Sequence, residues 1–108
     1  MMSNYRFMRL ILFFDLPVLT AAQRREYRKF VKLLKKSGFL MMQESVYVKM
    51  CLNDFNVKAT LAVLENHKPK EGSVATISVT EKQFSSMTFL VGDFSTDIVD
   101  SDERYIEL

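Results

Sequence analysis

The first strong pattern in the chain is an unbroken run of bulky apolar residues, LILFF, at Leu10–Phe14. A β-prone segment with both faces apolar is typical of a central strand. We expect this strand to span Phe7 to Leu16 and to end at Pro17, because proline cannot donate a ladder hydrogen bond. Asp15 interrupts the run. A carboxylate is costly to bury alone, so it should lie at the rim of the core, be paired, or serve in chemistry.

Helical spacing replaces the continuous run after the proline. Thr20 and Gln23 form a candidate capping box, and Gly38 suits a C-terminal cap. Between them an apolar stripe recurs at Tyr27, Phe30, Val31 and Leu34. The pattern predicts a helix over Ala21–Ser37.

The middle of the chain gives strand and then helix patterns. Residues 39–52, FLMMQESVYVKMCL, are rich in β-formers, with an irregular point at Gln43 and Glu44. Two short strands or one long bent strand fit equally well. Asn53 or Asp54 can cap a second helix, whose apolar pattern ends before the loop HKPKEG. Its apolar stripe comprises Val57, Leu61 and Leu64.

Strict alternation follows in SVATISVT, residues 73–80, which predicts a strand with one apolar face. A short link, EKQFSS, leads to MTFLVG, residues 87–92, where we expect another strand. The order of elements predicts an α+β, ferredoxin-like βαββαβ sandwich over residues 1–92, with two helices on one face of an antiparallel sheet.

The end of the chain does not fit a closed monomer. Residues 93–108 form an acidic tail that ends in a β-like YIEL. A strand separated from its domain in this way often pairs with another chain. We expect an extra C-terminal strand that contributes to a homodimer or to a partner contact.

Charge divides the chain into two halves. Residues 1–54 carry ten Lys or Arg against four Asp or Glu, while residues 55–108 carry five against nine. Seven of the fifteen cations lie between Arg24 and Lys36, opposed only by Glu26. Helical spacing places one row of them on a single side: Arg24, Arg28, Lys32, Lys35 and Lys36. A solvated face is one interpretation. Like charges four residues apart repel, however, so phosphates against this row explain it better.

Most enzyme sites are excluded by composition. The three glycines are too scattered for a phosphate-binding loop, and the single His67 allows no nucleophilic triad, so we expect it to be a solvated residue at a helix end. The lone Cys51 excludes an internal disulfide and a cysteine zinc cage, which suits a reducing cytosol. No apolar stretch approaches the ~20 residues of a membrane span, so we expect a cytoplasmic protein without membrane contact.

Asp15 remains as the candidate for chemistry. Mg²⁺ commonly takes one or two carboxylates and fills its other positions with water and substrate phosphate. In a symmetric dimer with its axis near this strand end, two copies of Asp15 would face each other and attract a proton or a divalent cation. The alternative is that Asp15 caps a local turn.

Several segments in series carry a resemblance to a known family: YRFMRLILFFDLP, RREYRKFVKLLKKSGF, QESVYVK, VTEKQF and SDER. Together they resemble the small CRISPR-associated proteins of the spacer-acquisition complex, the second member of the universal adaptation pair, known as CRISPR-associated endoribonucleases. The likeness covers nearly the whole chain and is greatest to members found with type II systems.

This resemblance implies a ferredoxin-like homodimer with facing sheets and a magnesium-assisted phosphodiesterase site. Asp15, from both protomers, would be the catalytic residue and the metal ligand. Arg24, Arg25 and Arg28 would contact the nucleic-acid backbone. Phe14 stands where many relatives have a tyrosine, so this chain has no phenol at that position. The implied partners are a larger integrase subunit and a duplex DNA spacer precursor, with RNA as another substrate class.

Three functions therefore stay open. The chain could be a metal-dependent nuclease that cuts RNA or DNA, or a non-catalytic DNA-binding scaffold in an integrase complex. A single-stranded RNA binder of the RNA-recognition type has a similar element order. It would need aromatic residues on the open sheet face, whereas residues 73–80 carry none.

Overall fold

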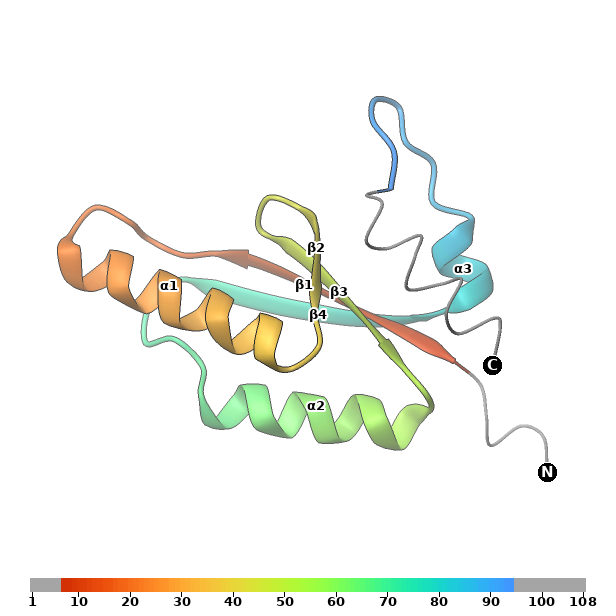
Figure 1. The fold of residues 1–108 in the computed structure, drawn as a ribbon, viewed down its shortest axis with the longest axis horizontal. Coiled ribbons are helices and arrows are strands. Elements are labelled where there is room, and N and C mark those ends of the chain that lie inside the picture. Colours follow the sequence, from red (N-terminus) through yellow and green to blue (C-terminus); the bar gives the residue numbers. More distant parts are fainter. Residues whose placement is uncertain (1–6, 95–108) are drawn as a thin grey trace.

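The computed structural model describes residues 7–94 of the 108-residue chain. In chain order the elements are β1 (Met8–Asp15), α1 (Ala21–Lys36), β2 (Leu40–Gln43), β3 (Val46–Cys51), α2 (Asp54–Asn66), β4 (Ser73–Thr80) and α3 (Glu81–Ser85). The four strands form one antiparallel sheet in the order β2-β3-β1-β4. Helices α1 and α2 run along the same side of it (Figure 1). This confirms the predicted ferredoxin-like sandwich.

Strand β1 is central, as its continuous apolar run predicts. Ile11 lies opposite Val48 of β3 and Ile77 of β4. Because side chains alternate along a strand, Leu10 and its i+2 neighbours point toward the two helices, while Ile11 and its i+2 neighbours point to the other face. We call these the helix face and the outer face of the sheet.

The main core fills the space between the helix face and the two long helices. Its buried members are Leu10, Leu12, Phe14, Leu16, Phe30, Leu34, Phe39, Tyr47, Cys51, Val57 and Leu64. Helix α1 contributes the i, i+4 pair Phe30 and Leu34, as its apolar stripe predicts. This packing fixes α1 against β1, so the opposite side of α1 is left to solvent.

Local signals set the ends of the helices as expected. The Thr20 hydroxyl accepts from the amide of Gln23 at 3.0 Å, and the Gln23 side chain accepts from the amide of Thr20 at 3.0 Å. Gly38 follows α1 with φ +97°, which glycine adopts without strain. Asn53 caps α2 through its side chain, which accepts from the amide of Asn56 at 2.9 Å.

The segment at residues 39–52 forms two strands rather than one bent strand. β2 and β3 pair through a bulge between Met41 and Gln43, and Glu44 and Ser45 make the turn. Ser45 takes φ +67°, which places this turn in the left-handed region. The irregular point predicted at Gln43 and Glu44 is confirmed.

The expectation for residues 81–92 is wrong in two respects. EKQFSS contains the short helix α3, which begins with a second capping box formed by Thr80 and Gln83. MTFLVG, residues 87–92, is not a strand. Phe84 and Met87 pack on the outer face instead, and Phe94 stacks on Phe84 with ring centroids 5.1 Å apart, whereas Leu90 and Val91 are exposed. β4 lies at the edge of the sheet, and residues 87–92 do not pair with its free side.

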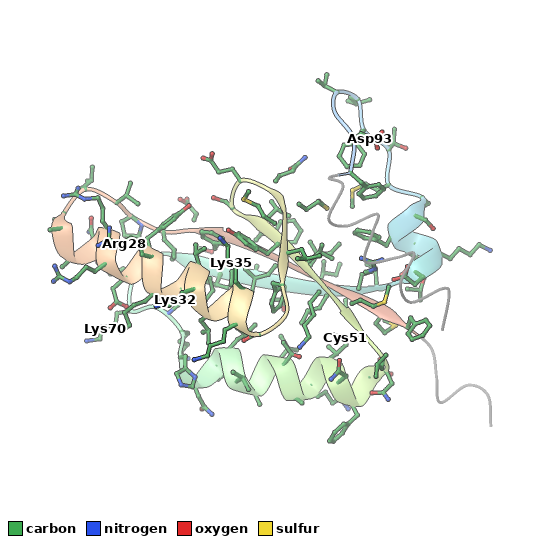
Figure 2. All side chains as sticks on the ribbon, viewed as in Figure 1. Arg28, Lys32, Lys35, Cys51, Lys70 and Asp93 are labelled. Atoms are coloured by element: carbon green, nitrogen blue, oxygen red, sulfur yellow. The ribbon has the colours of Figure 1, made fainter. Side chains whose placement is uncertain are left out.

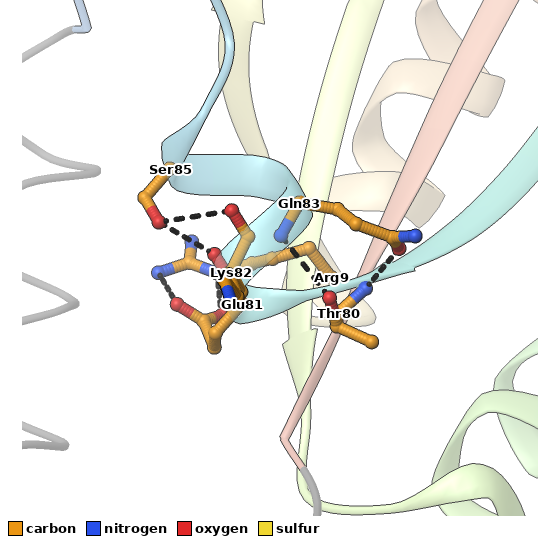
Figure 3. Close-up of polar contacts among 6 residues, drawn as sticks. All are labelled: Arg9, Thr80, Glu81, Lys82, Gln83 and Ser85. Carbon is orange, nitrogen blue, oxygen red and sulfur yellow. Dashed lines mark hydrogen bonds and ion pairs between the residues drawn. The ribbon is translucent and has the colours of Figure 1, made fainter.

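Helix α3 also covers the charged residue Arg9 at the start of β1. The Arg9 guanidinium is ion-paired with Glu81 (Figure 3). It also lies 4.6 Å from the centre of the Phe84 ring. The side of the outer face near Arg9 is thus covered by α3. Farther along β1 and β4, Phe13 is 44% exposed and Ile77 is 53% exposed.

The predicted tail of residues 93–108, including the strand YIEL, lies almost entirely outside the described residues. Its expected role in a dimer or a partner contact therefore stays a prediction. In the part of the chain that the structure describes, no helix has the length and apolar character that a membrane span requires.

Candidate nucleic-acid interface and carboxylate site

Asp15 is the last residue of β1 and is exposed on the outer face of the sheet. It lies directly opposite Ser73, the first residue of β4. Its carboxylate forms no hydrogen bond or ion pair with any residue between 7 and 94. The interpretation of Asp15 as a local turn cap therefore finds no support within this range, and the carboxylate remains accessible to an ion or a ligand.

The strand end that carries Asp15 is held from the side of the β2–β3 turn. The amide of Phe14 donates to the carbonyl of Ser45 at 3.1 Å. This bond continues the β1–β3 ladder by one residue, into the turn that precedes β3. Asp15 consequently projects from an anchored strand rather than from a free loop.

The aromatic residues next to Asp15 face the other way. The Phe14 ring packs against Tyr27 and Tyr47, with centroids 5.6 Å and 5.8 Å away, inside the helix-face core. Burial raises the pKa of the Tyr47 phenol, and the neighbouring Tyr27 raises it further. Position 14 therefore offers no phenol beside the carboxylate, and the Phe14 ring lies in the core with Tyr27 and Tyr47.

Every cation of α1 is exposed. Figure 2 shows Arg28, Lys32 and Lys35 following one another along the helix. Lys29 has an ion-pair partner, Glu26, at 3.8 Å. Five cations form neither an ion pair nor a side-chain hydrogen bond with any described residue: Arg25, Arg28, Lys32, Lys35 and Lys36. We call these five residues the basic ridge.

Arg24 differs from the basic ridge because its guanidinium is engaged by the protein itself. Its Nη1 donates to the carbonyls of Val18 and Leu19 at 3.1 Å and 3.0 Å. Those residues belong to the connection between Asp15 and α1. Arg24 therefore stabilises the loop that follows the carboxylate, a role that the charge pattern alone does not predict.

The loop between α2 and β4 brings further cations to α1. Two hollows of about 290 Å³ and 330 Å³ lie along α1, and both are lined by Glu26, Pro69 and Lys70. Figure 2 places Lys70 beside this part of α1. Lys68 lines the second hollow and is ion-paired with Glu65. Sequence reasoning missed these lysines because only the fold brings their loop to α1; the basic loop HKPKEG was the one available sign.

The described residues do not form a metal cage of their own. Residues 7–94 contain no group of three or more His, Cys, Asp or Glu side chains close enough to share an ion. A single exposed carboxylate still suits Mg²⁺, which keeps several waters and accepts phosphate oxygens as ligands. Asp15 fits a weak site that a phosphate or a second carboxylate would complete.

The other candidate ligands lie away from Asp15. Cys51 is fully buried, and burial raises the pKa of its thiol. His67 ends α2, where its Nδ1 lies 3.0 Å from the carbonyl oxygen of Val63. Its exposed position at a helix end is as predicted.

Residues 8–87 match the model of the family described as CRISPR associated protein Cas2. The chain belongs to the Cas2 family. A CRISPR-associated endoribonuclease Cas2 from Treponema denticola is 46% identical over 101 residues, covering 94% of this chain and 100% of the relative. A protein of the same name from Streptococcus mutans is also 46% identical over 101 residues, with 94% and 93% covered.

A solved structure described as the crystal structure of Cas2 supports the fold. It superposes with a TM-score of 0.58 at 21% identity, covering 83% of this Cas2-family chain and 92% of the solved one. The family resemblance seen in the sequence is therefore confirmed, and so is the ferredoxin-like architecture.

Proposed function

We propose that this protein is a nucleic-acid-binding subunit of a CRISPR spacer-acquisition complex, with a divalent-metal-dependent phosphodiesterase site at Asp15. The observation that carries this proposal is the basic ridge, whose five cations are exposed and form no ion pair with described residues. Lys and Arg in such a row repel one another until an anion neutralises them. Backbone phosphates supply that charge without base selectivity.

The anchored position of Asp15 supports the nuclease part of the proposal. Bound Mg²⁺ would provide Lewis-acid stabilisation of the charge that develops on a phosphate during cleavage. Asp15 would hold the ion, while the exposed strand end leaves room for a nucleic-acid backbone. The relatives from Treponema denticola and Streptococcus mutans are named endoribonucleases, which favours RNA cleavage and leaves duplex DNA as the bound partner in spacer acquisition.

A homodimer fits the open part of the outer face. Phe13 and Ile77 are 44% and 53% exposed there, next to Ala75, and Asp15 lies at the end of the same face. A second copy packed over this apolar area would exclude water from it. Two Asp15 carboxylates could then share one cation. The larger integrase subunit is proposed as the further protein partner, in line with the family.

A purely non-catalytic DNA scaffold is the second candidate. It is favoured by the absence of a three-residue ligand group within residues 7–94. A single carboxylate is expected to support only slow phosphodiester cleavage, whereas the basic ridge is expected to give salt-sensitive binding of nucleic acid.

One experiment separates these functions. Wild-type protein, Asp15→Ala and the double variant Arg28→Ala with Lys32→Ala are assayed for binding and for Mg²⁺-dependent cleavage of duplex DNA and single-stranded RNA. We expect Asp15→Ala to bind normally and to lose cleavage. The double variant should bind duplex about tenfold more weakly, and its slope of log affinity against log salt should fall by about 2, at ~0.9 per phosphate contact.

The exposed Lys58 and Lys82 lie on α2 and α3, so Lys58→Ala with Lys82→Ala is the control for a general loss of charge. Unchanged affinity and salt slope in the Arg28 and Lys32 variant would refute the role of the basic ridge. If wild type and Asp15→Ala both bind and neither cuts, the scaffold function replaces the nuclease.

A further inference from the structure

Gly72, the residue before β4, packs directly on the backbone of Asp15. A Cβ atom placed on Gly72 would lie 2.6 Å from the Asp15 carbonyl oxygen and 2.8 Å from Cδ2 of Leu16. The φ of Gly72 is +91°, a conformation that favours glycine. No other residue fits here unless the backbone at Asp15 moves.

Ser73 follows Gly72 and is the ladder partner of Asp15. Directly opposite residues on antiparallel strands have Cβ atoms about 4.5–5.5 Å apart on the same face. The Ser73 side chain is exposed, and its hydroxyl forms no hydrogen bond with any residue of the described range. The next pair on this face, Phe13 with Ala75, is apolar. Ser73 is therefore the polar residue of β4 that lies beside Asp15.

We propose that Gly72 is a positioning residue of the carboxylate site and that Ser73 is a second oxygen ligand in it. Gly72 fixes the backbone of Asp15, and the Ser73 hydroxyl supplies a second oxygen for a divalent cation held by Asp15. This inference rests on the proposed function at Asp15 and extends it to a segment that follows Asp15 by more than fifty positions in the sequence.

The chemistry of the pair suits a hard cation. Mg²⁺ and Mn²⁺ prefer oxygen ligands and retain water molecules, so a neutral hydroxyl beside a carboxylate can ligate the ion or hold one of its waters. A hydroxyl adds no negative charge and leaves Asp15 free to interact with a substrate phosphate through the ion. Ser73 thus adds orientation, while Asp15 provides the charge.

The test of Gly72 uses a second glycine as its matched control. Gly38 has φ +97°, and a Cβ placed on it would meet only the Lys49 side chain, at 3.5 Å, an ordinary contact. Gly38→Ala therefore carries the same backbone strain as Gly72→Ala but does not touch Asp15. The measurements are Mn²⁺ binding to the full-length protein by electron paramagnetic resonance, with and without an uncleavable duplex, and duplex affinity on the same samples.

We expect Gly72→Ala to weaken Mn²⁺ binding tenfold or more and to leave duplex affinity within twofold of wild type. Gly38→Ala should leave both quantities within twofold. Equal Mn²⁺ binding in wild type and Gly72→Ala, or an equal loss in Gly38→Ala, would overturn the role of Gly72.

A separate set of variants tests Ser73. This set still tests the inference if Gly72→Ala does not fold. Ser73→Ala should bind Mn²⁺ about threefold to fivefold more weakly, and Ser73→Thr, which keeps the hydroxyl, should restore binding. Ser78→Ala, on the same strand but on the helix face, is the control. Wild-type affinity in Ser73→Ala refutes the role of its hydroxyl.

Asp15→Ala distinguishes failure of this inference from failure of the proposed function. If Asp15→Ala loses Mn²⁺ while the Gly72 and Ser73 variants do not, the carboxylate site stands and its extension is wrong. If wild type binds no Mn²⁺ even with duplex present, both proposals for a metal site fail together.

Discussion

Arg9 and Asp15 lie on the same strand and the same face, six residues apart, yet their surroundings are opposite. Arg9 is 1% exposed, whereas Asp15 is exposed. The cover over Arg9 comes from the chain's own helix α3, whose Glu81 is ion-paired with its guanidinium (Figure 3). Phe84 of the same helix places its ring against the guanidinium. Nothing within residues 7–94 gives Asp15 a comparable partner.

The difference shows how a sheet face can be divided between folding and function. A buried guanidinium requires a counter-charge and hydrogen bonds, and Arg9 receives both, since its Nη2 lies 3.5 Å from Oε1 of Glu81. The Asp15 carboxylate at the other end of β1 has no partner among residues 7–94, so it is accessible to an ion or to another molecule. We therefore regard the Arg9 end as structural, and the proposed ion and partner contacts lie at the Asp15 end.

The largest effect should come from placing a charge in the open part of the outer face. Ile77→Glu should weaken self-association at least about 100-fold, because each dimer would bury two unpaired carboxylates. Analytical ultracentrifugation over a range of concentrations measures this. Thr76→Glu, which alters the neighbouring exposed residue on the helix face, should leave association within threefold. Dimers of unchanged affinity in Ile77→Glu would show that this face is not the interface.

A smaller effect is expected at the covered end. Glu81→Ala removes the counter-charge of a buried guanidinium and should lower the free energy of unfolding by about 2–3 kcal/mol. Urea denaturation at one fixed protein concentration measures it, because the proposed dimerisation would make stability depend on concentration. Glu65→Ala, which breaks the exposed pair with Lys68, should change stability by less than ~1 kcal/mol. Equal losses in the two variants would contradict the structural role of the Arg9 end.

The smallest effect should follow from neutralising the open carboxylate. Asp15→Asn keeps the size of the side chain and breaks no described hydrogen bond or ion pair, so the free energy of unfolding should stay within ~0.5 kcal/mol of wild type. The same denaturation series measures this. A loss as large as that of Glu81→Ala would mean that Asp15 serves folding, and the contrast between the two ends would disappear.

The parts of the fold that were predictable rest on short-range rules. The Thr20–Gln23 capping box and the helical stripe of α1 were recognised because all their interactions lie within a few residues. The continuous apolar run also identified β1 as central, since both of its faces are covered by protein over most of its length. Asp15 was recognised at the strand end for the same local reason.

What the sequence could not predict depends on contacts between distant segments. Residues 87–92 have strand-like composition, but the neighbouring Phe94 packs on Phe84 of α3, and the chain there does not extend along β4. Lys70 and Gly72 reach α1 and Asp15 only because α2 returns the chain to that end of the sheet. Arg24 looked like one more cation of the row, whereas its carbonyl partners are a feature of loop geometry.

The central position of β1 also matters while the protein is being synthesised. β1 leaves the ribosome well before β4, so one of its two neighbours is completed only when residues 73–80 have been translated. During that interval the apolar run Leu10–Phe14 has an unpaired edge, the kind of segment that nucleates aggregation. Arg9 and Asp15 stand immediately on either side of this run. Charges in such flanking positions are typical gatekeepers, so we expect both residues to disfavour pairing of this unfinished strand with its copies in the nascent chain.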